Sequence, residues 1–223
     1  MPSTAVLLDI DGTLVDSNFL HVEAWAHAFV DLGLSVPSWQ IQRSIGADST
    51  ELLGRLIGDQ TEEVQTRAKE LHSTHYDELV PRLELLPGAR ELITDLHDRG
   101  VRIVLATSAP ADELQALLKL LDIEDETYAV TSSEDVEKAK PEPDIISVAL
   151  QKGGIDADHA IMIGDSTWDI TAAGKAGVRA IGLLSGGTGE DDLMQAGAIA
   201  VYDGADDLRL HLADSALTGL FAQ

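Results

Sequence analysis

AVLLDIDGTLVDS, residues 5–17, joins a short apolar run directly to two carboxylates. The run at 5–8 is typical of a buried strand. Because side chains two apart on an extended chain point to the same side, Asp9 and Asp11 should lie close together and repel unless a cation or a shared proton relieves them. A solvated Asp-Gly turn explains the same residues equally well. The rest of the sequence has to distinguish a functional site at these carboxylates from a solvated turn.

Length and composition indicate a folded α/β protein. The 223 residues suffice for one domain of ordinary size with a smaller insert, and 44% hydrophobic residues with few aromatics argue against a disordered or membrane protein. No apolar run approaches the roughly 20 residues of a membrane helix, and residues 1–4 contain no basic leader. The absence of cysteine excludes disulfides and is compatible with a reducing compartment. We therefore expect a cytoplasmic location.

The charge balance restricts the classes of molecule that this chain can bind. Lys and Arg total 15 against 39 Asp and Glu, for a formal charge of −24. Such a chain should repel nucleic acid and anionic membrane surfaces, so we expect neither as a partner. It should also repel a phosphorylated metabolite at long range. Any anion that it binds has to be captured by a few local cations or by a bound metal.

Strand and helix signals alternate after one long interruption. From residue 18 to about 82 the apolar residues recur at helical intervals and no good strand is present. Beyond this helical insert, short apolar runs alternate with helical segments. The runs are at 101–106, 129–130, 160–163 and 178–184, the helical segments are at 86–98, 111–121, 145–151 and 170–176, and two short elements follow near 198–202 and 206–213. This alternation predicts a mostly parallel sheet covered by helices.

Polar residues collect where the predicted strands end. Thr107 and Ser108 follow one strand, and Asp165 follows another. Lys140 stands just before two prolines that suit a first helical turn and keep the preceding chain extended. Ligands of open parallel sheets bind beyond these strand ends, so three acids, two hydroxyls and one amine should converge on one crevice. Such a crevice could hold a metal, an anion and a nucleophile.

Four ordered motifs resemble those of the haloacid dehalogenase superfamily, in its phosphatase branch with a helical cap. They are DxDGT at 9–13, Thr107 at the end of an apolar strand, KPxPD at 140–144 and GDSxxD at 164–169. The resemblance covers nearly the whole chain. The resemblance implies a Rossmann-like parallel-sheet core formed by residues 1–16 and 84–223, with an all-helical cap at residues 17–83.

The resemblance also implies a phosphoryl-transfer chemistry. Asp9 would attack phosphorus to form an aspartyl phosphate, and Asp11 would protonate the leaving oxygen and later activate water. Thr107, the Ser108 backbone amide and Lys140 would hold phosphoryl oxygens.

A Mg²⁺ cofactor is part of the same implication. Asp9, the backbone carbonyl of Asp11 and Asp165 would bind the ion, and Asp169 would support its waters or orient Lys140. The implied substrate is a small phosphorylated metabolite similar to phosphoglycolate or a sugar phosphate. We expect a monomer or a homodimer.

Two neighbouring reactions are disfavoured by particular residues. The dehalogenase branch lacks a second acid such as Asp11. The phosphonatases use a cap lysine for a Schiff base, whereas the only lysine of the insert, Lys69, comes late in it. Schiff-base chemistry is therefore not expected.

A sugar phosphomutase similar to β-phosphoglucomutase is the nearer alternative. His21 and Trp25 match the start of that family's cap, and the segment ending at Gly46 resembles its specificity loop. Ser49, however, stands where such a mutase carries an arginine for a second phosphate, which favours hydrolysis. A catalytically silent binding protein also stays open.

The remaining candidates of the insert have two interpretations each. His21, Arg43 and Gly46 are candidates for substrate binding, but His21 could bond within its helix and Arg43 could be a surface charge. Trp25 and Trp39 are more typical of packing. His72 and His75 have the spacing of a metal pair but no companion acid motif, so no metal is expected there.

The glycine-rich run SGGTG at 185–189 could be taken for a phosphate cradle. The acids at 190–192 follow at once and would repel phosphate, so a flexible loop that leads into a helix is the better interpretation.

Overall fold

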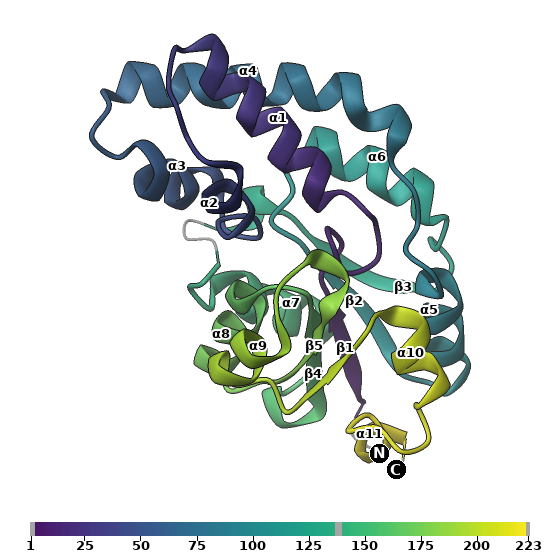
Figure 1. Ribbon diagram of the computed structural model, residues 1–223. Coiled ribbons are helices and arrows are strands. Elements are labelled where there is room, and N and C mark those ends of the chain that lie inside the picture. The colour runs from purple at the N-terminus through teal and green to yellow at the C-terminus, as the bar shows by residue number, and fades with distance from the viewer. Residues whose placement is uncertain (1–2, 137–139, 222–223) are drawn as a thin grey trace.

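A six-stranded parallel sheet forms the centre of the computed structural model, which describes residues 3–136 and 140–221 (Figure 1). The strand order is β3-β2-β1-β4-β5-β6, and every neighbouring pair is parallel. The strands are β1 Ala5–Leu8, β2 Arg102–Ala106, β3 Thr127–Thr131, β4 Ala160–Gly164, β5 Arg179–Leu183 and β6 Ala200–Tyr202. The predicted α/β, Rossmann-like class is confirmed.

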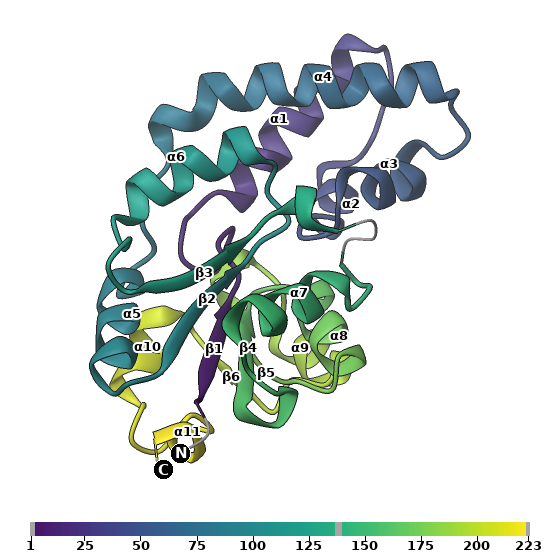
Figure 2. The same cartoon turned by 180° about the vertical axis from the view of Figure 1, so that it is seen from behind.

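Helices cover both faces of the sheet (Figures 1 and 2). Because strand side chains alternate, Val6 and Leu8 of β1 belong to one apolar cluster and Ala5 and Leu7 to the other. Helices α5, α6 and α10 pack on the first face, and α7, α8 and α9 on the second. The bounds are α5 Ala89–Asp98, α6 Ala111–Leu121, α7 Asp144–Gly153, α8 Thr167–Lys175, α9 Glu190–Ala196, α10 Ala205–Leu210 and α11 Thr218–Phe221.

The insert consists of four helices that lie across the carboxyl ends of the strands (Figure 1). They are α1 Asn18–Asp31, α2 Ser38–Gln42, α3 Ser49–Ile57 and α4 Glu62–Leu79. The insert has its own apolar cluster, which includes Trp25, Phe29, Ile41 and Leu53. Trp25 is therefore a packing residue, as its sequence context suggests, whereas Trp39 is 61% exposed. In the described part of the chain, no helix combines the length and the apolar character needed to cross a membrane.

Some element bounds differ from those expected. Helix α8 begins at Thr167 rather than at 170, because Ser166 and Asp169 form a reciprocal capping box. Strand β3 is longer than the two residues expected at 129–130. Helix α9 follows the glycine-rich loop, and its three leading acids stabilise the positive end of its macrodipole. This arrangement agrees with a loop that leads into a helix.

Candidate functional site

The ends of neighbouring strands bring three carboxylates together. Asp9 follows β1, and Asp165 follows β4, the strand paired with β1. Asp169 reaches the same point from the first turn of α8. One oxygen of each carboxylate lies within 4.8 Å of the others, and all three residues are buried. The structure thus places these acids in one cluster, as the parallel topology predicts.

Lys140 lies beneath this cluster and is its only close ammonium group among the described residues. Its Nζ atom is 2.6 Å from Asp9 Oδ1 and 2.6 Å from Asp169 Oδ1, and the residue is only 1% exposed. Burial alone would lower the pKa of Lys140, but Asp169 and Asp9 outweigh burial and raise it. The ammonium therefore stays charged and holds both carboxylates in position.

The cluster carries more negative charge than Lys140 can balance. Burial raises the pKa of Asp9 well above its usual range despite the adjacent ammonium, and burial together with Asp169 raises the pKa of Asp165 to about 7. Three ionised carboxylates facing one ammonium leave two negative charges in excess. A divalent cation or bound protons can relieve this excess. The all-oxygen donor set fits a hard cation such as Mg²⁺.

Several groups hold Asp165 in its orientation. Thr13 Oγ1 donates to one carboxylate oxygen at 3.2 Å, and Asn18 Nδ2 donates to the other at 2.8 Å. A Cβ atom on Gly186 would overlap the Asp165 carboxylate. The glycine therefore leaves the space that a carboxylate turned toward a cation requires.

Asp11 has a different environment from Asp9. The Ser17 hydroxyl donates to Asp11 Oδ1 at 2.6 Å, and His21 Nε2 lies 3.7 Å from the same oxygen. Burial would raise the pKa of Asp11, but the His21 and Ser17 contacts outweigh it and lower the pKa. Burial would likewise lower the pKa of His21, yet Asp11 raises it. Asp11 and His21 thus form a pair beside the cavity in which each group favours the charged form of the other.

A cavity of about 360 Å³ lies between the sheet and the insert. Asp9, Asp11, Thr107 and Ser108 line it from the core, and His21 and Gly46 are among its lining residues from the insert. The structure therefore brings most of the predicted substrate-binding residues to one space.

Thr107 and Ser108 offer two hydroxyl groups at this cavity. Thr107 is fully buried, and its Oγ1 accepts the Ala109 amide at 3.0 Å, so it also organises the turn before α6. Ser108 Oγ is buried and has no hydrogen-bond partner within the described residues. An oxyanion in the cavity could satisfy this hydroxyl.

Gly46 allows the insert to approach the core closely. Its φ is +92°, and a Cβ atom there would lie 2.8 Å from Ser166 Oγ. Arg43, only three residues earlier, does not line the cavity. It borders a separate cleft together with Gln42, Arg55 and Trp168, so its role in substrate binding stays a prediction.

His72 and His75 have different hydrogen-bond partners. His72 Nε2 lies 3.2 Å from His21 Nδ1, whereas His75 Nε2 lies 2.8 Å from Asp31. The two rings therefore have separate partners.

Glu113 and Lys69 are two of the cavity residues that were not predicted as part of the site. Glu113 lies in the first turn of α6, where an acid is usual, so nothing in the sequence marks it. Burial raises its pKa to about 7. Lys69 also lines the cavity, although its late position in the insert argued only against a Schiff base.

Comparison with known proteins agrees with this geometry. The family model described as haloacid dehalogenase-like hydrolase matches residues 6–183, so the chain belongs to this family and is a hydrolase by that membership. A crystal structure of a hydrolase from Pseudomonas syringae superimposes with a TM-score of 0.91 at 34% identity, covering 96% of this chain and 99% of that one.

Two curated relatives carry more specific names. Phosphoglycolate phosphatase of Rhodospirillum rubrum is 29% identical and aligns over 89% of this chain and 86% of its own length. Pyrophosphatase PpaX of Halalkalibacterium halodurans is 28% identical and aligns over 87% of this chain and 90% of its own length.

Proposed function

We propose that this chain is a Mg²⁺-dependent phosphatase that hydrolyses a small phosphomonoester through an aspartyl phosphate on Asp9. The observation that carries the proposal is the position of Asp9, which is bonded to Lys140, clustered with two further carboxylates and facing the cavity. The names of both relatives, a phosphoglycolate phosphatase and a pyrophosphatase, support a small phosphorylated substrate, and the first name supports a phosphomonoester of the phosphoglycolate type.

Asp9, Asp165 and the backbone carbonyl of Asp11 would hold Mg²⁺, which when bound supplies positive charge to the phosphoryl oxygens. Asp169 bonds to Lys140 and would fix the ammonium rather than face the substrate.

The chain's own groups account for the two half-reactions. In the first, Asp9 attacks phosphorus, the bond to the leaving oxygen breaks, and Asp11 gives that oxygen a proton. In the second, Asp11 takes a proton from water, which attacks phosphorus and releases Asp9. His21 lies 3.7 Å from Asp11 and would supply and store the proton. Thr107, the Ser108 amide and Lys140 would offset the charge that develops on the phosphoryl oxygens.

Residues 17–83 would act as a cap domain over a core of residues 1–16 and 84–223. The separate apolar cluster of the insert and the close approach at Gly46 support this division. Closure of the cap would exclude bulk water during the first step and admit one water for the second. The cytoplasmic location stays a prediction.

Phosphate release from a panel of small phosphomonoesters, with and without Mg²⁺, tests the proposal. Wild type should release phosphate only when Mg²⁺ is present. Asp9→Asn should release no phosphate, with or without Mg²⁺. Asp98→Asn, an exposed acid at the end of α5, is the matched control and should behave as wild type. A requirement for a sugar bisphosphate would indicate a mutase instead, and silence of a folded, metal-loaded protein would indicate a binding protein.

A further inference from the structure

Lys69 is the only lysine or arginine that lines the cavity within the described residues. It projects from α4 of the insert, and its Nζ atom donates to Thr50 Oγ1 at 2.9 Å. Lys140 is buried beneath the carboxylates and is already bonded to two of them. Lys69 therefore supplies a second positive charge, from the part of the cavity wall that the insert forms.

The surroundings of Lys69 favour an anionic ligand. In the described part of the chain no carboxylate lies within 4.0 Å of its ammonium, and Nζ donates its one side-chain hydrogen bond to the Thr50 hydroxyl. Ser73 lies one helical turn further along α4 and also lines the cavity. Ser49, next to Thr50 in the chain, lines the cavity as well. These three side chains offer one ammonium and two hydroxyls.

The acidic residues that line the cavity do not neutralise the positive charge of Lys69. Asp48 is the nearest along the chain, but its Oδ1 accepts the amides of Thr50 and Glu51 and caps α3. Its charge is thus offset by the positive end of that helix. Asp112 and Glu113 line the cavity from the first turn of α6, which belongs to the core, whereas Lys69 lines it from the insert.

We infer that Lys69, together with Ser49 and Ser73, binds a second anionic group at the far end of the substrate. This inference rests on the proposed function and narrows it to phosphomonoesters with a carboxylate or a second phosphate. A lysine ammonium is a compact charge whose attraction to an anion increases in a partly desolvated cavity. A phosphomonoester with a neutral end would leave the ammonium without its partner.

Three substrates on one three-carbon chain isolate the effect: propanediol monophosphate, phosphooxypropanoate and propanediol bisphosphate. Lys69→Met should lower kcat/KM about tenfold for the two anionic-ended substrates, mainly through KM, and leave the neutral-ended one within about twofold. Lys69→Arg should retain most of the preference. Selective loss on only one of the anionic-ended substrates identifies the natural anion as carboxylate or phosphate.

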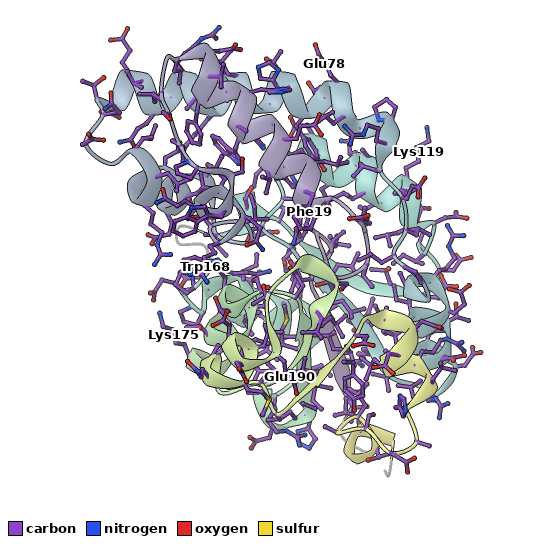
Figure 3. All side chains as sticks on the ribbon, viewed as in Figure 1. Phe19, Glu78, Lys119, Trp168, Lys175 and Glu190 are labelled. Atoms are coloured by element: carbon purple, nitrogen blue, oxygen red, sulfur yellow. The ribbon has the colours of Figure 1, made fainter. Side chains whose placement is uncertain are left out.

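Lys119→Met is the matched control, because it removes the same charge from an exposed position at the outer edge of α6 (Figure 3). It should leave all three values unchanged. An equal loss of kcat/KM on all three substrates in Lys69→Met, or no loss, would overturn the inference.

Calorimetry separates this inference from the proposed function. With Mg²⁺ present, wild type should bind phosphonobutanoate about tenfold more tightly than butylphosphonate, and Lys69→Met should bind both alike. If no substrate is hydrolysed, the proposed function fails, and this binding difference still decides the role of Lys69. Equal affinities in wild type would contradict it.

Discussion

Replacing Lys140 with methionine should destabilise the protein strongly. Methionine has a similar volume, so packing changes little, but two carboxylates 2.6 Å from the ammonium lose their partner. Removing one partner of a buried ion pair costs about 3–5 kcal/mol, and both carboxylates of this site are buried. We expect the free energy of unfolding, measured with urea at pH 8 in EDTA, to fall by about that amount.

Two further measurements make this test specific. Lys175→Met breaks an ion pair of similar length, 2.7 Å to Glu142, but both side chains are more than 40% exposed, so the loss should stay below about 1 kcal/mol (Figure 3). Added Mg²⁺, or acidification to pH 5, should restore part of the stability of Lys140→Met, because either neutralises the carboxylates. A loss no larger than that of Lys175→Met would refute the electrostatic role of Lys140.

Three other substitutions test separate features of the site: a buried acid, the position of Asp165 and the contact between insert and core. Glu113→Gln should raise the free energy of unfolding by at most about 3 kcal/mol at pH 8 and leave it unchanged at pH 4, because the pKa of Glu113 is raised from 4.5 to about 7 and the folded state loses stability as the carboxyl ionises. Equal effects at both pH values would contradict the burial of this acid. Gly186→Ala should weaken Mg²⁺ binding at least about tenfold in a calorimetric titration, since the added Cβ displaces the Asp165 carboxylate. Gly46→Ala should cost about 1 kcal/mol or more in urea unfolding, because its φ is +92° and Ser166 lies against it; an unchanged midpoint would argue against the close approach of insert and core.

The central cluster could be predicted from the sequence because its members follow strands. Asp9 and Asp165 each come directly after a short apolar run, and parallel strands place such residues at one edge of the sheet. The earlier start of α8 was also readable, since Ser166 and Asp169 have the spacing of a capping box. In these cases the local spacing of residues in the sequence is sufficient to predict their position in the structure.

The cavity wall formed by the insert could not be predicted in the same way. Whether Arg43 or Lys69 faces the cavity depends on how four helices pack across the strand ends, which is a long-range property. Glu113 is similar, because its first-turn position is typical of any helix and only its burial against the insert distinguishes it. Local patterns carry no information on this packing.

Detection of the phosphoryl group on Asp9 tests the central claim most directly. Asp11→Asn should be mixed with Mg²⁺ and an aryl phosphate, whose good leaving group needs little acid assistance, while water activation is lost. After acid quenching, mass spectrometry should find a phosphoryl adduct on the peptide that contains Asp9, and Asp9→Asn should show none. Turnover of wild type without any adduct in Asp11→Asn, or an adduct on another residue, would contradict the account.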